Sequence, residues 1–287
     1  MISQQQLKAL LQEQKIGLSA PEVLVELPEG PIFQVLIKGG SHALDQWQQA
    51  RGLVNITGLY PVIVASKEAM MTEILAERTQ PEVETAEIVR QAQEMDAMRA
   101  LANGLYYQEI NHTGEWREWP VLSEDGAGRI PVEVFSAADP RTYLPWIEEV
   151  LGPWPENINP EEFSKHPQRL TLPEGLKTVS LCLLPVEQSW QVPVLLGWGA
   201  WNECPLPVEH ACVHLYWYNR YGAEIVCLDG DLVELIVPHP PITLEECCKL
   251  ALEHFAYSAD TLYQEDWLLK DYVAHLSGNQ FWFFWWD

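Results

Sequence analysis

The chain has 287 residues, which is enough for one large domain or two ordinary ones. Hydrophobic residues make up 47% of the chain, and this content excludes a disordered protein. The 41 acidic and 17 basic side chains give a formal net charge of −24, which argues against nucleic acid as a partner because phosphate binding requires clustered Lys and Arg. This charge suits a basic protein partner, although an ordinary acidic cytosolic protein is the favoured interpretation.

The N-terminal segment and the cysteines point to the cytoplasm. Residues 1–17 lack the basic and apolar regions of a signal peptide, and no apolar run is long enough to span a membrane. The six cysteines show neither C-x-x-C pairs nor zinc-finger spacing, which is typical of free thiols in a reducing compartment. We therefore expect a cytoplasmic protein without a membrane partner.

Residues 1–150 have the mixed helix and strand pattern of an α/β region. Runs rich in β-branched residues and bounded by Gly and Pro predict strands, and apolar residues repeating every three or four positions predict helices. The region forms either a unit of its own or part of one compact unit with the rest of the chain. The expected elements are a helix at 3–15, a hairpin of strands at 23–27 and 33–38, a strand at 60–66, a helix at 82–102 and a strand at 129–135.

A proline-rich connection separates this region from the C-terminal part of the chain. Residues 151–175 contain five prolines, and such a density prevents regular secondary structure. We interpret the segment as a long connection over the surface and as the boundary of a C-terminal α+β domain at 176–287.

The C-terminal domain has sharper signals. The runs on either side of Asp229-Gly230 are rich in β-branched residues, which is the signature of a type I′ hairpin. Thr243, followed three residues later by Glu246, forms a capping box that opens a helix. The expected elements are strands at 178–186 and 192–198, a helix at 207–222, the hairpin strands at 223–228 and 231–237, helices at 244–257 and 266–277, and a strand at 280–286.

The chain ends with six aromatic residues, Phe281 to Trp286, followed by Asp287. An exposed aromatic tail forgoes about 1.5–3 kcal/mol per large side chain, so we expect a buried strand in the middle of the sheet with both faces covered. The fold class is therefore α+β, with an antiparallel or mixed sheet that has this C-terminal strand inside it. The helices expected to pack on the sheet are those at 207–222, 244–257 and 266–277.

The predicted helix at 207–222 carries a stripe of polar-tipped rings. His210, His214, Trp217 and Tyr221 recur at helical spacing on one face. Two histidines four residues apart can share a metal ion, but the Glu of the H-E-x-x-H motif is absent and spacing identifies no third ligand. We therefore favour rings that hydrogen-bond locally at a half-buried seam, and we expect no metal.

Two carboxylates lie on otherwise apolar faces of the predicted hairpin. With a two-residue loop, Ile225 faces Glu234, and Glu224 lies on the opposite face of the sheet. An unpaired buried carboxylate is costly, and Arg220 is the expected partner of one of the two. A structural ion pair is favoured over an acid–base pair, because this register keeps the carboxylates apart.

The segment GWGAWNECP at 197–205 combines two glycines with rings and an amide. The glycines permit tight backbone geometry, and Trp198, Trp201 and Asn202 supply groups suited to binding. Cys204 is close enough in sequence to His210 to pair with it as nucleophile and base. A single cysteine is more often inert, however, and we expect no catalytic residue.

Several motifs, in a fixed order, carry a resemblance to a known family. They are GWGAWNECP at 197–205, EHACVHLYWYNRYGAEIV at 209–226, Glu234-Leu235, PPIT at 240–243, AYSAD at 256–260 and FWWD at 284–287. A C-terminal stretch of about 110 residues, the size of one domain, thus resembles the bacterial domain-of-unknown-function family 4253. TGLYPVIV at 57–64 is similar to a weaker upstream pattern of the same proteins. The resemblance implies a bacterial cytosolic protein with a C-terminal strand, and it supplies no activity.

Three functional hypotheses follow. The first is a non-catalytic binding protein of the bacterial cytoplasm, immunity-like or regulator-like, whose acidic surface and Trp-rich cleft hold a protein partner. The second is a small-molecule or metal-dependent enzyme that uses the His210/His214 and Glu224/Glu234 region, and the third is a structural subunit of a homo-oligomer. The first is favoured because the sequence contains no complete catalytic set, and no cofactor is expected. The candidate binding residues are Trp198, Trp201, Asn202, His210, His214, Trp217, Arg220, Tyr221, Glu224 and Glu234.

Overall fold

The structure is a computed structural model that describes residues 2–64, 84–113, 130–157, 170–171, 175–263 and 267–287. Parts of several predicted elements, and most of the predicted connection at 151–175, lie outside these ranges. The described strands are β1 (Glu22–Leu27), β2 (Gly30–Lys38), β3 (Tyr60–Val64), β4 (Thr178–Leu184), β5 (Glu224–Leu228), β6 (Leu232–Ile236) and β7 (Phe281–Trp285).

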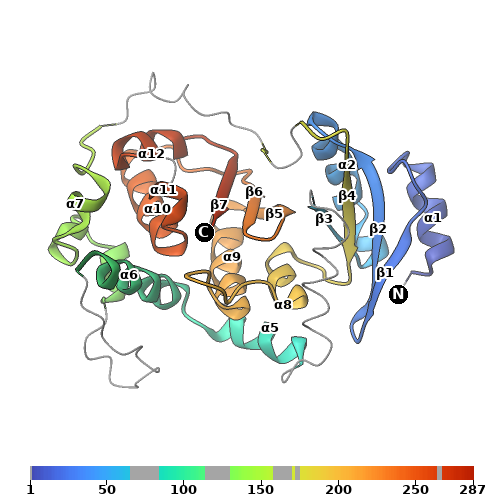
Figure 1. Cartoon of the computed structure of the whole chain (residues 1–287), viewed down its shortest axis with the longest axis horizontal. Helices are drawn as coiled ribbons and strands as arrows, with labels where there is room; N and C mark the ends of the chain where they lie inside the picture. Colours follow the sequence, from blue (N-terminus) through green and yellow to red (C-terminus); the bar gives the residue numbers. More distant parts are fainter. Residues whose placement is uncertain (1, 65–83, 114–129, 158–169, 172–174, 264–266) are drawn as a thin grey trace.

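The helices lie mainly around the two ends of the sheet. Figure 1 shows α1 and α2 beside the N-terminal strands, and α6, α10 and α12 at the opposite end of the molecule. Among the described residues, no helix combines the length and the apolar character needed to cross a membrane. The α-helices are α1 (Gln4–Glu13), α2 (Ser41–Arg51), α3 (Val54–Thr57), α5 (Thr85–Glu94), α6 (Ala97–Thr113), α7 (Ile147–Leu151), α8 (Val192–Leu196), α9 (Pro207–Tyr221), α10 (Leu244–Tyr257), α11 (Asp260–Tyr263) and α12 (Leu269–Leu276); the 3-10 helices are η1 (Val132–Phe135), η2 (Pro140–Thr142) and η4 (Ser189–Gln191).

The described strands form one mixed sheet in the order β1-β2-β4-β3-β5-β6-β7. β3 runs parallel to β5, and the other neighbouring pairs are antiparallel. β4 lies between β2 and β3, so strands from the regions at 1–150 and 176–287 alternate in the sheet. The predicted α+β class with a mixed sheet is confirmed.

The last strand occupies one edge of this sheet. β7 is a member of the sheet, as predicted, but it pairs with β6 alone among the described strands. Trp282 and Phe284 are buried, whereas Phe281, Phe283 and Trp285 are half-buried, so the covered faces alternate along the strand. The expectation of a central strand with both faces covered is therefore wrong. β7 is an edge strand, and its side chains are fully buried on one face only.

The covered face of β7 packs against α9 and α10. Trp217 of α9 stacks on Phe284 with ring centroids 5.3 Å apart and an interplanar angle of 9°. His254 and Tyr257 of α10 contact the Phe284 ring at 4.7 and 4.8 Å in T-shaped arrangements. Offset and edge-to-face contacts of this kind are the preferred geometries of aromatic pairs. The aromatic residues of β7 thus form the surface against which α9 and α10 pack.

The predicted helices of the C-terminal region are confirmed, and their ends have identifiable causes. Pro207 occupies the first turn of α9, and Gly222 ends the helix in a left-handed conformation with φ of 68°. Thr243 caps α10 by accepting a hydrogen bond from the backbone N–H of Glu246 at 3.3 Å. The predictions at 3–15, 23–27, 33–38, 178–186 and 266–277 are also confirmed within the described residues.

Two predicted strands are wrong. Residues 192–196 form the helix α8, which begins with Pro193 in its first turn and ends at Gly197 with φ of 62°. This arrangement of Pro and Gly is typical of helices, and a short apolar run does not distinguish a buried helix from a strand. The predicted strand at 129–135 contains the 3-10 helix η1, which begins directly after Pro131.

The predicted helix at 82–102 is two helices. α5 ends at Glu94, and Met95 is extended with ψ of 143°. The carboxylate of Asp96 then accepts a hydrogen bond from the backbone N–H of Met98 at 2.9 Å, which satisfies an otherwise unpaired donor at the start of α6. The apolar periodicity thus continues from α5 into α6, although the helix is interrupted at Met95. Asp96 caps the new helix that follows.

The predicted hairpin forms, but its register differs from the expected one. Cys227 faces Glu234 and Ile225 faces Leu235, with an irregularity between these two pairs. The expected pairing of Ile225 with Glu234 is therefore wrong. The register already differs beside the turn, where Leu228 faces Val233 and not Asp231, and the irregularity between Cys227 and Ile225 shifts it once more.

The turn of the hairpin also differs. The backbone N–H of Asp229 donates to the carbonyl of Leu232 at 2.8 Å, which makes Gly230 and Asp231 the loop residues. None of the residues 229–231 has the positive φ that a type I′ turn requires. Instead, the indole of Trp198 donates to the carbonyls of Asp229 and Gly230 at 3.0 and 3.1 Å, so a tertiary contact holds the turn.

Substitutions on the two faces of β7 test whether the helix-covered face anchors the strand. We expect Phe284→Ala to lower the free energy of unfolding by about 3–5 kcal/mol, because it empties a fully enclosed site. Phe283→Ala, on the half-buried face, is the matched control and should cost clearly less. Urea unfolding of both variants measures the difference. Equal losses would contradict the assignment of α9 and α10 as the anchoring contact.

Candidate functional site

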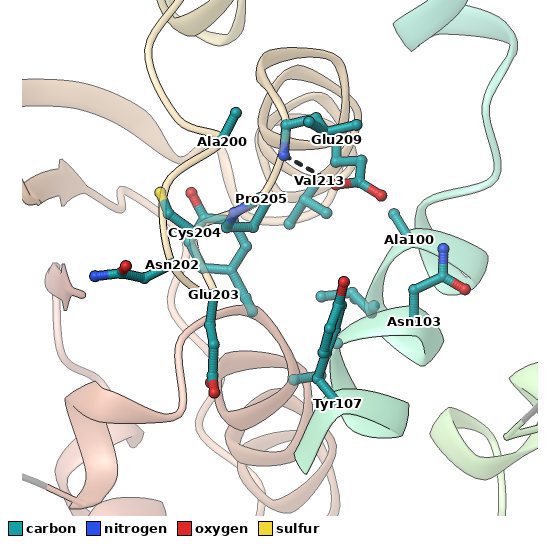
Figure 2. Close-up of a pocket in the computed structure, with 15 residues that line it drawn as sticks. Ala100, Asn103, Tyr107, Ala200, Asn202, Glu203, Cys204, Pro205, Glu209 and Val213 are labelled. Atoms are coloured by element: carbon teal, nitrogen blue, oxygen red, sulfur yellow. Dashed lines mark hydrogen bonds between the residues drawn. The ribbon is translucent and has the colours of Figure 1, made fainter. Parts of the chain in front are cut away.

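A cavity of about 340 Å³ lies where α6, α9 and the loop at 197–206 meet the end of α10. Figure 2 shows Asn103 and Tyr107 of α6 on one side of this space and the loop with α9 on the other. We call it the α6–α9 cavity. Its lining residues are Ala100, Leu101, Asn103, Gly104, Tyr107, Ala200, Asn202, Glu203, Cys204, Pro205, Leu206, Glu209, Val213, Ala256 and Tyr257.

One face of α6 forms a wall of the cavity. Ala100, Asn103, Gly104 and Tyr107 follow the spacing of three and four residues that places side chains on one side of a helix. Gly104 lets this wall approach α10 closely, since a Cβ atom at this position would lie 1.9 Å from the carbonyl oxygen of Ala256. The absence of a side chain at Gly104 therefore sets the distance between the two helices.

The loop opposite α6 has a constrained backbone. Gly199 has φ of 116°, and a Cβ atom there would lie 2.3 Å from the carbonyl oxygen of Pro205 and 2.9 Å from Nε2 of His210. Ala200 and Asn202 adopt positive φ values of 72° and 46°, which non-glycine residues rarely do. Such conformations persist where the surroundings impose them, and they cluster at ligand sites.

Two carboxylates give the cavity its charge. Burial raises the pKa of Glu209, and hydrogen bonds from the Leu206 backbone N–H at 2.9 Å and from Asn103 act in the opposite direction. Gln108 of α6 donates to the Glu203 carboxylate at 2.9 Å and so ties the loop to the helix. Figure 2 shows the Glu209 carboxylate directed toward the side of the cavity formed by α6.

The electrostatic field of these carboxylates reaches neighbouring groups. Burial raises the pKa of Tyr107, and the charges of Glu209 and Glu203 raise it further. Burial likewise raises the pKa of Asp260, which Glu203 also influences. Among the residues that the structure describes, none of those lining the cavity is Lys, Arg or His. The interior of the cavity is therefore a region of negative potential.

The floor of the cavity leads into a buried chain of polar groups. The Cys204 sulfur lies 3.3 Å from Nε2 of His210, and Nδ1 of the same ring lies 2.6 Å from the Tyr257 hydroxyl. That hydroxyl is also 2.8 Å from Nε2 of His214. Cys204 and Tyr257 line the cavity, whereas both imidazoles are buried behind them. We call these four residues the thiol–imidazole chain.

The groups of this chain are held in their neutral forms. Burial raises the pKa of the Cys204 thiol and of the Tyr257 hydroxyl, and it lowers the pKa of His210. Burial also lowers the pKa of His214 to about 3. Desolvation disfavours every charged form, so protons are shared along hydrogen bonds and no ion pair is formed.

Few of the sequence-predicted binding residues reach this cavity. Asn202 lines it, but its side chain points away from Tyr107 and donates to the Asp287 carbonyl. His210 and His214 lie behind the floor, and Trp201 packs edge-on against Trp198 at 5.2 Å. The predicted residues that are buried are Trp198, His210, His214, Trp217, Tyr221 and Glu234.

The carboxylates of the hairpin have partners other than the expected one. Glu224 forms an ion pair with Arg51 of α2 and accepts a hydrogen bond from the Tyr60 hydroxyl at 2.9 Å. Glu234 accepts from the Thr171 hydroxyl at 2.6 Å. Glu224 is therefore paired with Arg51, which is distant in the sequence, and the expected ion pair of Arg220 with Glu224 is wrong.

Arg220 belongs to a different group of side chains. Its guanidinium donates to the Tyr216 hydroxyl at 3.3 Å and lies 5.3 Å from the centroid of the Tyr221 ring. Tyr216 and Trp217 both donate to the buried carboxylate of Glu253, at 3.0 and 2.9 Å. Burial raises the pKa of Glu253 to about 6. These contacts join α9 to α10 away from the α6–α9 cavity.

The two histidines of the stripe do not form a metal centre with other residues. Both present a nitrogen to the same Tyr257 hydroxyl, which occupies the point that a shared ion would take. Within the described ranges, no group of three or more His, Cys, Asp or Glu side chains is placed to hold a metal ion. The imidazoles of the stripe hydrogen-bond locally, but the stripe is fully buried and not the half-buried seam expected from the sequence.

Sequence analysis missed the residues that α6 contributes to the cavity. Asn103, Gly104 and Tyr107 lie nearly a hundred residues before Glu203, and no local motif connects them. The spacing of small and polar residues along one face of α6 was the available signal. Tyr257, at the end of α10, was equally hidden, because its role depends on the tertiary contact between α10 and α9.

Comparison with known proteins identifies only the C-terminal region. Residues 180–287 match the family model described as Domain of unknown function (DUF4253). The match begins within β4 and includes α9, α10 and β7. The matched residues therefore include every listed lining residue of the cavity except those of α6. No curated protein matches the chain. No solved structure matches it either.

The close approach at Gly104 is open to a direct test. We expect Gly104→Ala to lower the free energy of unfolding by about 1–3 kcal/mol, because the added methyl group overlaps the backbone of Ala256. Gly52→Ala is the matched control. Gly52 has φ of −62°, and its nearest contact to an added Cβ is 3.3 Å, so little change is expected. Chemical denaturation compares them, and a neutral Gly104→Ala would contradict the packing of α6 on α10.

The buried imidazoles predict a loss of stability in acid. Burial lowers the pKa of His210, His214 and His254 in the folded state, so their contribution is complete above the unfolded value of about 6.5 and declines as pH falls below it. Each should cost about 1.4 kcal/mol at pH 5.5. Glu253, Glu209 and Asp260, whose carboxyl pKa values are raised by burial, act in the opposite sense as pH falls. Urea unfolding at pH 7.5 and 5.5 measures the net change.

A variant separates the histidine contribution from that of other groups. His214→Asn removes one buried imidazole, so its stability should depend less steeply on pH than that of the unchanged chain. An unfolding free energy that is the same at pH 7.5 and pH 5.5 in the unchanged chain would contradict the neutral, desolvated state of the three rings.

Proposed function

We propose that the protein is a non-catalytic binding protein whose α6–α9 cavity receives a cationic group from a basic partner. The observation that supports this proposal is the composition of the cavity wall, whose described residues include Glu203 and Glu209 and no Lys, Arg or His. A carboxylate that loses water on burial gains most from a positively charged neighbour, and Glu209 is in this position.

The dimensions of the cavity suit a single side chain or a small ligand. Ligand pockets typically measure about 300–1,000 Å³, and the cavity lies at the lower end of this range. A guanidinium group matches a carboxylate through two parallel hydrogen bonds. The ring of Tyr107 offers an aromatic face beside the carboxylates, and such faces attract cations. An arginine side chain is therefore the best-fitting occupant.

The charge of the whole chain supports a protein partner of opposite sign. The net charge of −24 creates a field that raises the association rate of basic partners, and the effect weakens as ionic strength rises. Immunity and regulatory proteins are the class in which a small acidic protein holds one such partner. All six cysteines are free and buried, which favours the reducing interior of a bacterial cell as the compartment.

Binding of an arginine derivative tests this proposal. We expect the full chain to bind arginine amide at least tenfold more tightly than citrulline amide, its uncharged near-isostere, in titration calorimetry at low ionic strength. Glu209→Gln should weaken arginine amide binding about tenfold, equivalent to about 1.4 kcal/mol. Glutamine also fits the third position of a helix capping box, so the helix start is preserved.

A distant carboxylate provides the control for that substitution. Glu245 lies at the exposed start of α10 and pairs with Lys249, away from the cavity. Glu245→Gln changes the net charge equally and should leave arginine amide binding unchanged. Equal weakening in both variants would show that net charge, and not the cavity, binds the cation. Equal affinity for arginine and citrulline amides would contradict the proposal.

A further inference from the structure

A large apolar side chain lies exposed at the α6–α9 cavity, and the binding of a cation alone gives it no role. Leu206 lines the cavity, and 51% of its surface is exposed. Among the large hydrophobic residues that are exposed in the described part of the chain, only Leu206 lines this cavity. Single apolar residues scattered over a surface need no explanation. An apolar side chain that shares a cavity with two carboxylates is a candidate contact for whatever enters it.

Leu206 also occupies a position where local stability favours a polar residue. It is the N-cap of α9, and its side chain makes no capping hydrogen bond because leucine has no side-chain oxygen. Ser, Thr, Asp and Asn are preferred there, since their side chains accept from the backbone N–H groups of the first turn. The Glu209 carboxylate accepts from the Leu206 N–H at 2.9 Å, so half of a capping box is present. Residues that break such a local rule are expected at functional sites.

The backbone around Leu206 is stiff. Pro207 restricts the residue before it to extended conformations, and Leu206 has φ of −65° and ψ of 153°. On the other side, the ring of Pro205 fixes its own φ, and its carbonyl accepts a hydrogen bond from the backbone N–H of Ala200 at 2.9 Å. A side chain on a segment that is already ordered binds at a low entropic cost. Leu206 is therefore exposed and held in place at the same time.

We propose that Leu206 is an apolar contact for the partner, and that the α6–α9 cavity recognises a protein segment in which an arginine directly neighbours a large apolar residue. The inference rests on the proposed function, because the carboxylates of Glu203 and Glu209 select the arginine. The neighbouring side chain of the partner covers Leu206 and removes apolar surface from water. Charge thus determines which side chain enters the cavity, and the apolar contact strengthens binding of the segment that carries it.

The closeness of the apolar group and the carboxylate sets the spacing in the partner. The hydrogen bond between the Leu206 N–H and the Glu209 carboxylate joins the two within one turn of structure. Consecutive residues of a chain have Cα atoms about 3.8 Å apart. A residue next to the arginine is therefore within reach of Leu206 while the guanidinium lies at the carboxylates. This proximity is the reason for assigning the apolar residue to a position adjacent to the arginine.

Matched dipeptides test the proposal on the full, unchanged chain. The probes are N-acetylated dipeptide amides in which phenylalanine precedes or follows arginine, and the same two peptides with glycine in place of phenylalanine. In titration calorimetry, we expect at least one phenylalanine peptide to bind about tenfold more tightly than its glycine counterpart, because it buries a large apolar side chain. Added sodium chloride should weaken binding of both peptides and leave their ratio unchanged, since salt screens charges and not apolar contacts.

Leu206→Ser separates a role in binding from a role in the fold. Serine completes the capping box with Glu209, so the variant should unfold at a higher urea concentration than the unchanged chain. Its affinity for the phenylalanine peptide should nevertheless fall about tenfold, to that of the glycine peptide. Ile242→Ser is the matched control, because Ile242 is 73% exposed and precedes the start of α10, whereas the cavity meets the opposite end of that helix. It should leave the affinities of both peptides unchanged.

The remaining outcomes separate this inference from the proposed function. Equal affinities of the phenylalanine and glycine peptides in both orders would overturn the inference, and this result requires no variant to fold. A preference for phenylalanine that persists in Leu206→Ser, or is lost equally in Ile242→Ser, would also overturn it. Selectivity for arginine amide over citrulline amide is measured independently. If that selectivity is present without a preference for phenylalanine, the cation site stands and the apolar contact is rejected.

Discussion

The indole of Trp217 lies flat against the ring of Phe284, and the C-terminal half of the chain is arranged around this contact. Trp217 belongs to α9 and Phe284 to β7, so the stack fixes the helix on the edge strand. Tyr257 of α10 meets both rings edge-on, at 5.0 and 4.8 Å. The same tyrosine carries the hydroxyl between His210 and His214. The hydrophobic packing of the tail and the floor of the cavity are thus one structure.

The wall and the floor of the cavity differ in how much contact they have with water. Its carboxylate-bearing wall lies closer to water, with Glu203 exposed and Glu209 half-buried. Its floor is enclosed by aromatic rings, and desolvation keeps the thiol and the imidazoles neutral. The carboxylates of the wall and the neutral, hydrogen-bonded groups of the floor therefore lie next to each other in one cavity. This separation supports the proposed cation site.

Local signals predicted much of the fold and little of the site. Pro207, Gly222 and Thr243 mark helix ends through short-range geometry, so those boundaries were predictable. The apolar run at 192–198 was ambiguous, because strands and buried helices share that composition. The partner of Glu224 is Arg51, which lies far away in the sequence, whereas Arg220 was expected because it lies just upstream of the hairpin. The cavity required α6 to meet α9, which is a tertiary event that no local pattern encodes.

The position of β4 has a consequence for synthesis on the ribosome. β2 and β3 both hydrogen-bond to β4 and not to each other, and β4 begins only at Thr178. β2 and β3 therefore emerge without this neighbour, and more than a hundred residues follow β3 before β4 is synthesised. An unpaired strand edge is adhesive during such an interval. Completion of the sheet is a late step, and the nascent N-terminal part depends on its own helices, α1 and α2, to shield apolar surface until then.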